Sequence, residues 1–79
     1  MARQVIVYST PLCAPCEALK SYLRRNDVAF EVKDLMMDED AAERLEGLGI
    51  RASPALEVDG RILAGPTLTP EAVDELLGL

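Results

Sequence analysis

The sequence predicts a single α/β domain in which a four-stranded mixed sheet is flanked by three helices. Short apolar runs, typical of strands, alternate with segments whose apolar residues recur every three or four positions, as in helices. In addition, a pair of close cysteines, Cys13 and Cys16, stands where the first strand pattern gives way to the first helix pattern. The predicted order is β-α-β-α-β-β-α over residues 1–79.

Residues 5–8 form a run of mostly β-branched apolar residues, which is typical of a strand buried at the centre of a sheet. A buried helix segment is the alternative, but Pro11 follows too soon for a helix to continue. From residue 14 the spacing becomes helical, and Pro15 suits a first helical turn. The predicted apolar face of this helix carries Cys16, Leu19 and Leu23.

Val28, Phe30 and Val32 alternate with polar or small residues, which predicts a second strand, parallel to the first, with one face on the core. Met36 and Met37 are predicted to pack where that strand ends. The acidic run at 38–40 predicts the start of a second helix, because acidic groups stabilise helix N-termini. A metal site is the weaker interpretation of three adjacent acids.

Two further strands are predicted at 55–58 and 61–64, since Asp59-Gly60 between them suits the two-residue turn of a β-hairpin. A last helix is predicted to begin at Pro70, with Thr69 as its cap.

The cysteine pair is poorly placed to be structural, because a disulfide across so short a loop constrains the unfolded chain very little. Redox chemistry and metal binding remain. A helix N-terminus favours a thiolate through its unpaired N–H groups, and the thiolate is the reactive form. We therefore predict Cys13 as the exposed nucleophile and N-cap, its sulfur accepting from the N–H of Cys16. Cys16, on the apolar face, is predicted to be the buried thiol that resolves the mixed disulfide.

The formal net charge of −6 and the lack of a basic cluster argue against nucleic acid as a partner. The N-terminal residues do not resemble a secretion signal, and no apolar run is long enough for a membrane span. The expected compartment is the reducing cytoplasm, where close cysteine pairs are usually catalytic or metal-binding.

Residues 5–16 resemble the start of a glutaredoxin, residues 49–60 are similar to the cis-proline segment of glutaredoxins and thioredoxins, and Gly65 matches the glycine after their last strand. From the residues alone, Pro54 suits a cis-proline and a plain strand start equally; the resemblance favours cis. It implies the thioredoxin-like three-layer fold and a monomeric thiol–disulfide oxidoreductase that reduces protein disulfides as a general electron carrier. The implied substrate contacts are Thr10, Pro11, Leu12, Ala14, Pro15, Ser53, Pro54 and Gly65.

The chain departs from classical glutaredoxins at the positions that hold glutathione. Ala14-Pro15 replaces Pro-Tyr, and Ser9 and Thr10 stand where a basic residue is usual. Residues 65–68 replace Gly-Gly and an acidic pair. Arg51 remains as a partner for a glutathione carboxylate. The pattern resembles redoxins of the NrdH type, so the reductant is expected to be a thioredoxin-reductase-like flavoprotein or glutathione. No metal ligand set and no tightly bound cofactor is predicted beyond the redox-active disulfide.

Two other functions compete with the oxidoreductase. One is a dimeric iron–sulfur or metal-binding protein, since a single pair supplies two thiolates and the chain has no histidine. The other is a non-catalytic adaptor that binds a partner in a groove near Leu12, Pro54 and Pro66. Iron content would identify the first, and activity that survives cysteine substitution would identify the second.

Overall fold

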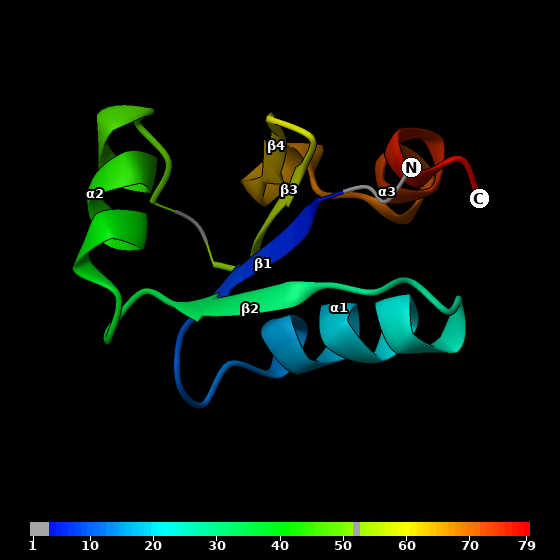
Figure 1. Cartoon of the computed structure of the whole chain (residues 1–79), viewed down its shortest axis with the longest axis horizontal. Coiled ribbons are helices and arrows are strands. Elements are labelled where there is room, and N and C mark those ends of the chain that lie inside the picture. The colour runs from blue at the N-terminus through cyan, green and yellow to red at the C-terminus, as the bar shows by residue number, and fades with distance from the viewer. Residues whose placement is uncertain (1–3, 52) are drawn as a thin grey trace.

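The computed structural model describes residues 4–51 and 53–79; Ala52, within the segment that resembles a cis-proline loop, lies outside them. The elements follow the predicted order (Figure 1). The strands are β1 (Val5–Ser9), β2 (Glu31–Asp34), β3 (Ala55–Val58) and β4 (Arg61–Ala64). The helices are α1 (Ala14–Arg25), α2 (Glu39–Gly47) and α3 (Pro70–Leu77), with a 3-10 turn η1 (Gly65–Thr67) before α3.

The sheet has the strand order β2-β1-β3-β4. The strand β1 pairs parallel with β2 and antiparallel with β3, and β3 pairs antiparallel with β4. Asp59 and Gly60 join the last two strands with φ angles of 49° and 91°, as a type I′ turn requires. Every residue of the central strand β1 is buried, as its apolar run predicts.

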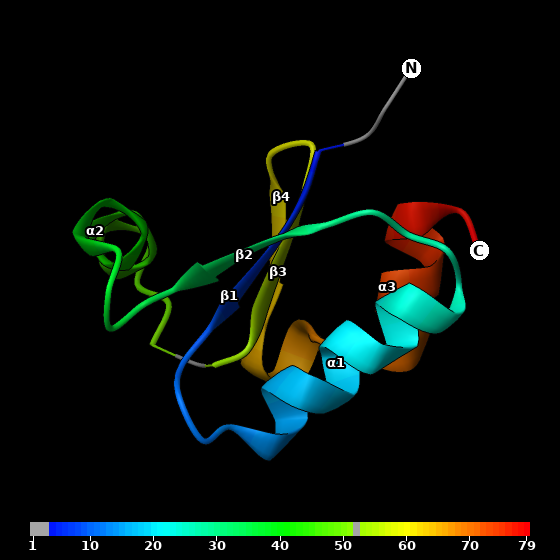
Figure 2. The same cartoon turned by 60° about the horizontal axis from the view of Figure 1, so that its bottom comes forward.

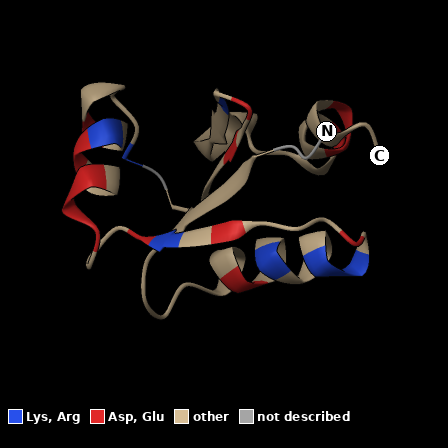
Figure 3. Ribbon diagram, viewed as in Figure 1, with Lys and Arg blue, Asp and Glu red and all other residues tan. Residues whose placement is uncertain are grey.

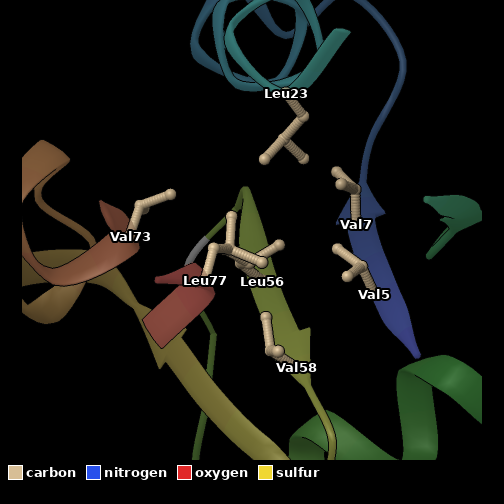
Figure 4. Packing of buried hydrophobic residues seen from close by; sticks show 7 residues of the cluster. All are labelled: Val5, Val7, Leu23, Leu56, Val58, Val73 and Leu77. Atoms are coloured by element: carbon tan, nitrogen blue, oxygen red, sulfur yellow. The ribbon is translucent and has the colours of Figure 1, made fainter. Parts of the chain in front are cut away.

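The helices cover the two faces of the sheet unequally, with α1 and α3 on one face and α2 on the other (Figures 1 and 2). Alternation along β1 sends Val5 and Val7 toward α1 and α3. Figure 4 shows these side chains converging with residues of α1, α3 and β3. The buried members of this cluster are Val5, Val7, Leu23, Leu56, Val58, Val73 and Leu77.

On the opposite face, Ile6 and Tyr8 pack with residues of α2. The Tyr8 hydroxyl donates to Glu57 Oε1 at 2.6 Å, and Arg44 of α2 donates to both oxygens of that carboxylate at 3.2 and 3.1 Å. Burial, and then the Glu57 carboxylate, raise the pKa of Tyr8 to about 12. A buried polar link therefore ties α2 to the sheet.

Each α-helix begins with a side chain that accepts a backbone N–H three residues on. Asp38 caps α2 by accepting from the N–H of Ala41 at 3.0 Å, which confirms the helix-capping interpretation of the acidic run. Figure 3 shows acidic residues at the start of α2 and basic residues along α1. No helix in the described part of the chain is long and apolar enough to cross a membrane.

Two predictions near β2 are wrong. The strand begins at Glu31, so Val28 and Phe30 pack against the core from outside it, and Val32 is 43% exposed. Met36 and Met37 are 72% and 82% exposed instead of packed. The N–H of Leu35 donates to the Ser9 carbonyl at 2.8 Å. The Leu35 side chain packs against the core at the end of the strand, where Met36 and Met37 were expected to pack.

Candidate active site

The cysteine pair lies at the turn between β1 and α1. Cys13 has an extended backbone and is the N-cap of α1, and its Sγ accepts from the N–H of Cys16 at 3.1 Å. Pro15 lies in the first turn, where its missing N–H breaks no helical hydrogen bond. The predicted cap is therefore present, and its donor is the backbone of the second cysteine.

Cys13 and Cys16 are joined by a disulfide. Cys13 is partly exposed, whereas Cys16 is 0% exposed on the apolar face of α1. Attack from solvent is open to the first sulfur and closed to the second. This asymmetry is the one expected of a nucleophile and a resolving thiol.

A second segment reaches the sulfurs from far along the chain. The contact between Ser53 and Thr10 places Ser53 beside the loop after β1. Ser53 precedes Pro54 through a cis peptide bond, as the resemblance implies, and Pro54 is buried. The Ser53 hydroxyl lies 3.2 Å from Cys16 Sγ, 3.9 Å from Cys13 Sγ and 3.1 Å from the Thr10 hydroxyl.

These contacts of the Ser53 hydroxyl were not predicted, since Ser53 was expected only as a substrate contact. The signal available in the sequence is that Thr10 and Ser53 both precede a proline and both flank predicted site segments. Their contact joins residues 43 positions apart, which local patterns cannot reveal.

A pocket of about 450 Å³ opens beside the cysteine pair, between α1 and the start of α3. Of the predicted contacts, it includes Pro15, Ser53, Pro54 and Gly65. Most of its lining was not predicted to belong to a site. Leu19 was assigned to the apolar face of the first helix, and Thr69 and Pro70 to the start of the last one. The other lining residues that were given no site role are Ala18, Tyr22, Leu68 and Val73.

Other predicted contacts lie outside this pocket. Pro11, Leu12 and Ala14 are exposed beside the cysteines, and Thr10 reaches the site through Ser53. Pro66, expected in a groove with Leu12 and Pro54, does not line it. Of these three residues Pro54 alone lines the described pocket, and the predicted groove stays a prediction.

The described lining of the pocket carries no charged side chain. At its edge the Tyr22 hydroxyl donates to Asp74 Oδ1, which links α1 to α3. That hydrogen bond is the main reason why the pKa of Tyr22 is raised. Arg51 is exposed and lines a different hollow, against α2.

No group of three or more His, Cys, Asp or Glu residues is placed to hold a metal ion within residues 4–51 and 53–79. Cys13 and Cys16 form a disulfide at the turn between a strand and a helix. The fold and this site define a thioredoxin-like protein with a redox-active Cys-x-x-Cys pair.

Comparison with known proteins gives the family. The family model for glutaredoxin matches residues 5–63, and the chain belongs to the glutaredoxin family. A glutaredoxin-like 8.6 kDa protein of the rubredoxin operon of Clostridium pasteurianum is 30% identical over 60 residues, which are 75% of this chain and 80% of the relative. The glutaredoxin-like protein NrdH of Lactococcus lactis is 28% identical over 61 residues, 77% and 85% of the two chains.

The fold is also found in a solved relative. The crystal structure of the thioredoxin-like protein BC3987 superposes with a TM-score of 0.81 at 32% identity, covering 92% of this chain and 99% of the other. The predicted four-stranded sheet with three helices is thereby confirmed as the thioredoxin-like glutaredoxin fold.

Proposed function

We propose that this glutaredoxin-like protein is a small electron carrier that reduces protein disulfides through Cys13 and Cys16. One observation carries the proposal: the sulfur of partly exposed Cys13 accepts the N–H of Cys16 at a helix start, and Cys16 is buried one turn beyond. A hydrogen-bond donor aimed at the first sulfur favours its thiolate, which is the attacking species in disulfide exchange.

The reaction has two exchange steps. The Cys13 thiolate attacks one sulfur of the substrate disulfide, and the other substrate sulfur leaves with the electron pair and takes up a proton. Cys16 then attacks Cys13 Sγ, so that the intramolecular disulfide forms and the second substrate sulfur leaves. The substrate gains two electrons, and the cysteine pair loses two.

We further propose a thioredoxin-reductase-like flavoprotein as the electron donor. Glutathione carries two carboxylates, and the described pocket beside the disulfide offers no cationic side chain to them. Arg51, the candidate partner, lines the hollow against α2. The lining of the pocket beside the disulfide therefore does not fit glutathione. Its apolar surface suits the side chains of a polypeptide.

The test is a comparison of two reducing systems. The oxidised protein is supplied with insulin as the disulfide and with NADPH, and is coupled either to thioredoxin reductase or to glutathione and glutathione reductase. We expect turnover with the first system and little with the second. Faster turnover with glutathione would overturn the assignment of the donor, and no turnover with either would overturn the function.

The roles of the cysteines are tested by single substitutions. We expect Cys13→Ser to abolish turnover, because the accessible sulfur is lost. Cys16→Ser should instead trap the substrate as a mixed disulfide, visible as a mass increase that a reductant removes. Equal alkylation rates for the two thiols of the reduced protein would contradict the assignment.

We also propose that the protein acts as a monomer in the reducing cytoplasm, where an open dithiol can be kept reduced. Sedimentation of the reduced protein tests the first statement, and cell fractionation tests the second.

A further inference from the structure

The hydroxyl of Ser53 stands between the buried sulfur and the surface. It is 3.2 Å from Cys16 Sγ and 3.1 Å from the hydroxyl of Thr10, which is partly exposed. In the disulfide the Cys16 sulfur carries no proton and can only accept, whereas in the contact between Thr10 and Ser53 either hydroxyl can be the donor. In the reduced protein Cys16 is a thiol. Thiol and hydroxyl groups both donate and accept, so the three groups form a chain along which protons can shift.

Both hydroxyls are held in place by their neighbours in sequence. Thr10 precedes Pro11 and Ser53 precedes Pro54, and a following proline restricts the backbone of the residue before it. Pro54 is also buried, which holds the residues just before β3 in place. The chain of hydroxyls is therefore preorganised by the fold.

The second exchange step creates a need for such a chain. Cys16 must lose its proton before it attacks, and burial of a thiol disfavours the ionised form and keeps water away. A proton acceptor supplied by the protein would therefore speed this step at neutral pH, where solvent base is scarce.

The contacts point to a hydroxyl as that acceptor, not to a carboxylate. The described buried carboxylate, Glu57, lies on the opposite face of the sheet and is held by Tyr8 and Arg44. On α1, the neighbouring Glu17 and Lys20 form an ion pair with each other.

We propose that Ser53 and Thr10 carry the proton of Cys16 to solvent during resolution of the mixed disulfide. The Cys16 thiol passes its proton to Ser53 Oγ while the Ser53 proton moves to Thr10 Oγ1 and a Thr10 proton moves to water. The Cys16 thiolate forms the bond to Cys13 Sγ, and the departing substrate sulfur takes a proton from solvent. This inference rests on the proposed function; it assigns Ser53, whose hydroxyl contacts Cys16 Sγ, as a catalytic residue of the second step, and Thr10 as a residue that acts through Ser53.

The two exchange steps can be watched separately. The reduced protein is mixed with an equimolar amount of a symmetrical nitrobenzoic acid disulfide, which releases one coloured thiolate when Cys13 attacks and another when Cys16 resolves. Without the hydroxyl we expect Ser53→Ala to slow the second release roughly tenfold, the loss typical of a hydrogen bond to a charged group. The effect on the first release should be smaller.

Matched variants separate proton transfer from packing. Ser53→Thr keeps the hydroxyl and should retain the second release, whereas Thr10→Val, but not Thr10→Ser, should slow it. Ser21→Ala removes a serine hydroxyl from α1 away from the pocket and should match the unaltered protein. Raising the pH should restore the second release in Ser53→Ala, because solvent base then replaces the path.

Each contrary result has a definite meaning. A second release in Ser53→Ala as fast as in Ser21→Ala, or equal slowing of both releases, would overturn the inference. A larger effect on the first release would assign the Ser53 hydroxyl to Cys13, 3.9 Å away. If the unaltered protein gave no coloured thiolate at all, the proposed function itself would fail.

Discussion

Leu12, which directly precedes the first cysteine, is the most exposed large apolar residue of the described chain, and its φ angle of 55° lies in the left-handed region. Leucine adopts this region at a cost, because its Cβ crowds the backbone. Leucine at this position therefore costs stability and leaves a large apolar side chain in contact with solvent beside the cysteines. We infer that it contacts the substrate polypeptide.

Leu12→Asn tests this inference, since asparagine tolerates left-handed backbone and carries no apolar surface. We expect KM for insulin to rise about threefold to tenfold, corresponding to roughly 1 kcal/mol of lost apolar contact. The rate with a small aromatic disulfide should not change, and the Tm should stay the same or rise. An unchanged KM for insulin would show that Leu12 does not touch the substrate.

At this scale, prediction from sequence depended on distance along the chain. The capping of α1 by Cys13 was predictable because donor and acceptor are three residues apart. The contact of Ser53 with Cys16 spans 37 residues, so it depends on how β3 and α1 are brought together. A serine hydroxyl gives no sign in the sequence of which partner it will meet.

At the scale of elements, α2 is attached to the sheet by a small apolar cluster and by the link between Tyr8, Glu57 and Arg44. Tyr8→Phe removes one donor from the nearly buried Glu57 carboxylate. We expect a loss of about 1–2 kcal/mol in the free energy of unfolding at neutral pH, measured by urea denaturation. An unchanged value would show that Arg44 alone satisfies Glu57.

The same link predicts how stability changes at high pH. The pKa of Tyr8 is about 12 in the folded protein, against an ordinary value of about 10 that applies to the unfolded chain. The folded state therefore holds this proton more tightly. Its contribution is fully present below pH 10 and is lost as the pH rises toward 12, because the unfolded chain binds fewer protons there. Tyr8→Phe should reduce the fall in the free energy of unfolding between pH 10 and pH 12, measured by urea denaturation. Tyr22→Phe keeps Tyr8 and should retain the fall that Tyr8 causes.

The elements themselves were predictable where a strong local signal marks their ends. Asp59-Gly60 defined the hairpin, and Thr69-Pro70 defined the start of α3. The start of β2 was misplaced because Val28 and Phe30 are apolar for packing against the core, while pairing with β1 begins at Glu31. The spacing of apolar residues indicates which side chains are buried, but the hydrogen bonds of a strand can begin at a different residue.

At the scale of the whole molecule, stability rests on the two apolar clusters of a 79-residue chain. Domains of this size unfold with about 4–12 kcal/mol. Leu23 lies on α1, is fully buried and packs against the sheet. Leu23→Ala should lower the free energy of unfolding by about 2–5 kcal/mol and leave the protein partly unfolded.

Met37→Ala is the matched control, because Met37 is 82% exposed. It should change the free energy of unfolding by no more than about 0.5 kcal/mol. A comparable loss in both variants, measured by urea denaturation, would contradict this account of the core.

The group that holds the Cys13 sulfur is a main-chain amide, that of Cys16. Side-chain replacements leave a main-chain amide in place, with proline at that position as the exception. The surface around the pair, including Leu12 and the pocket lining, is free to change without removing this donor. If the gene were duplicated and the copies diverged in these surface residues, the proteins would keep similar thiol reactivity while binding different substrate proteins.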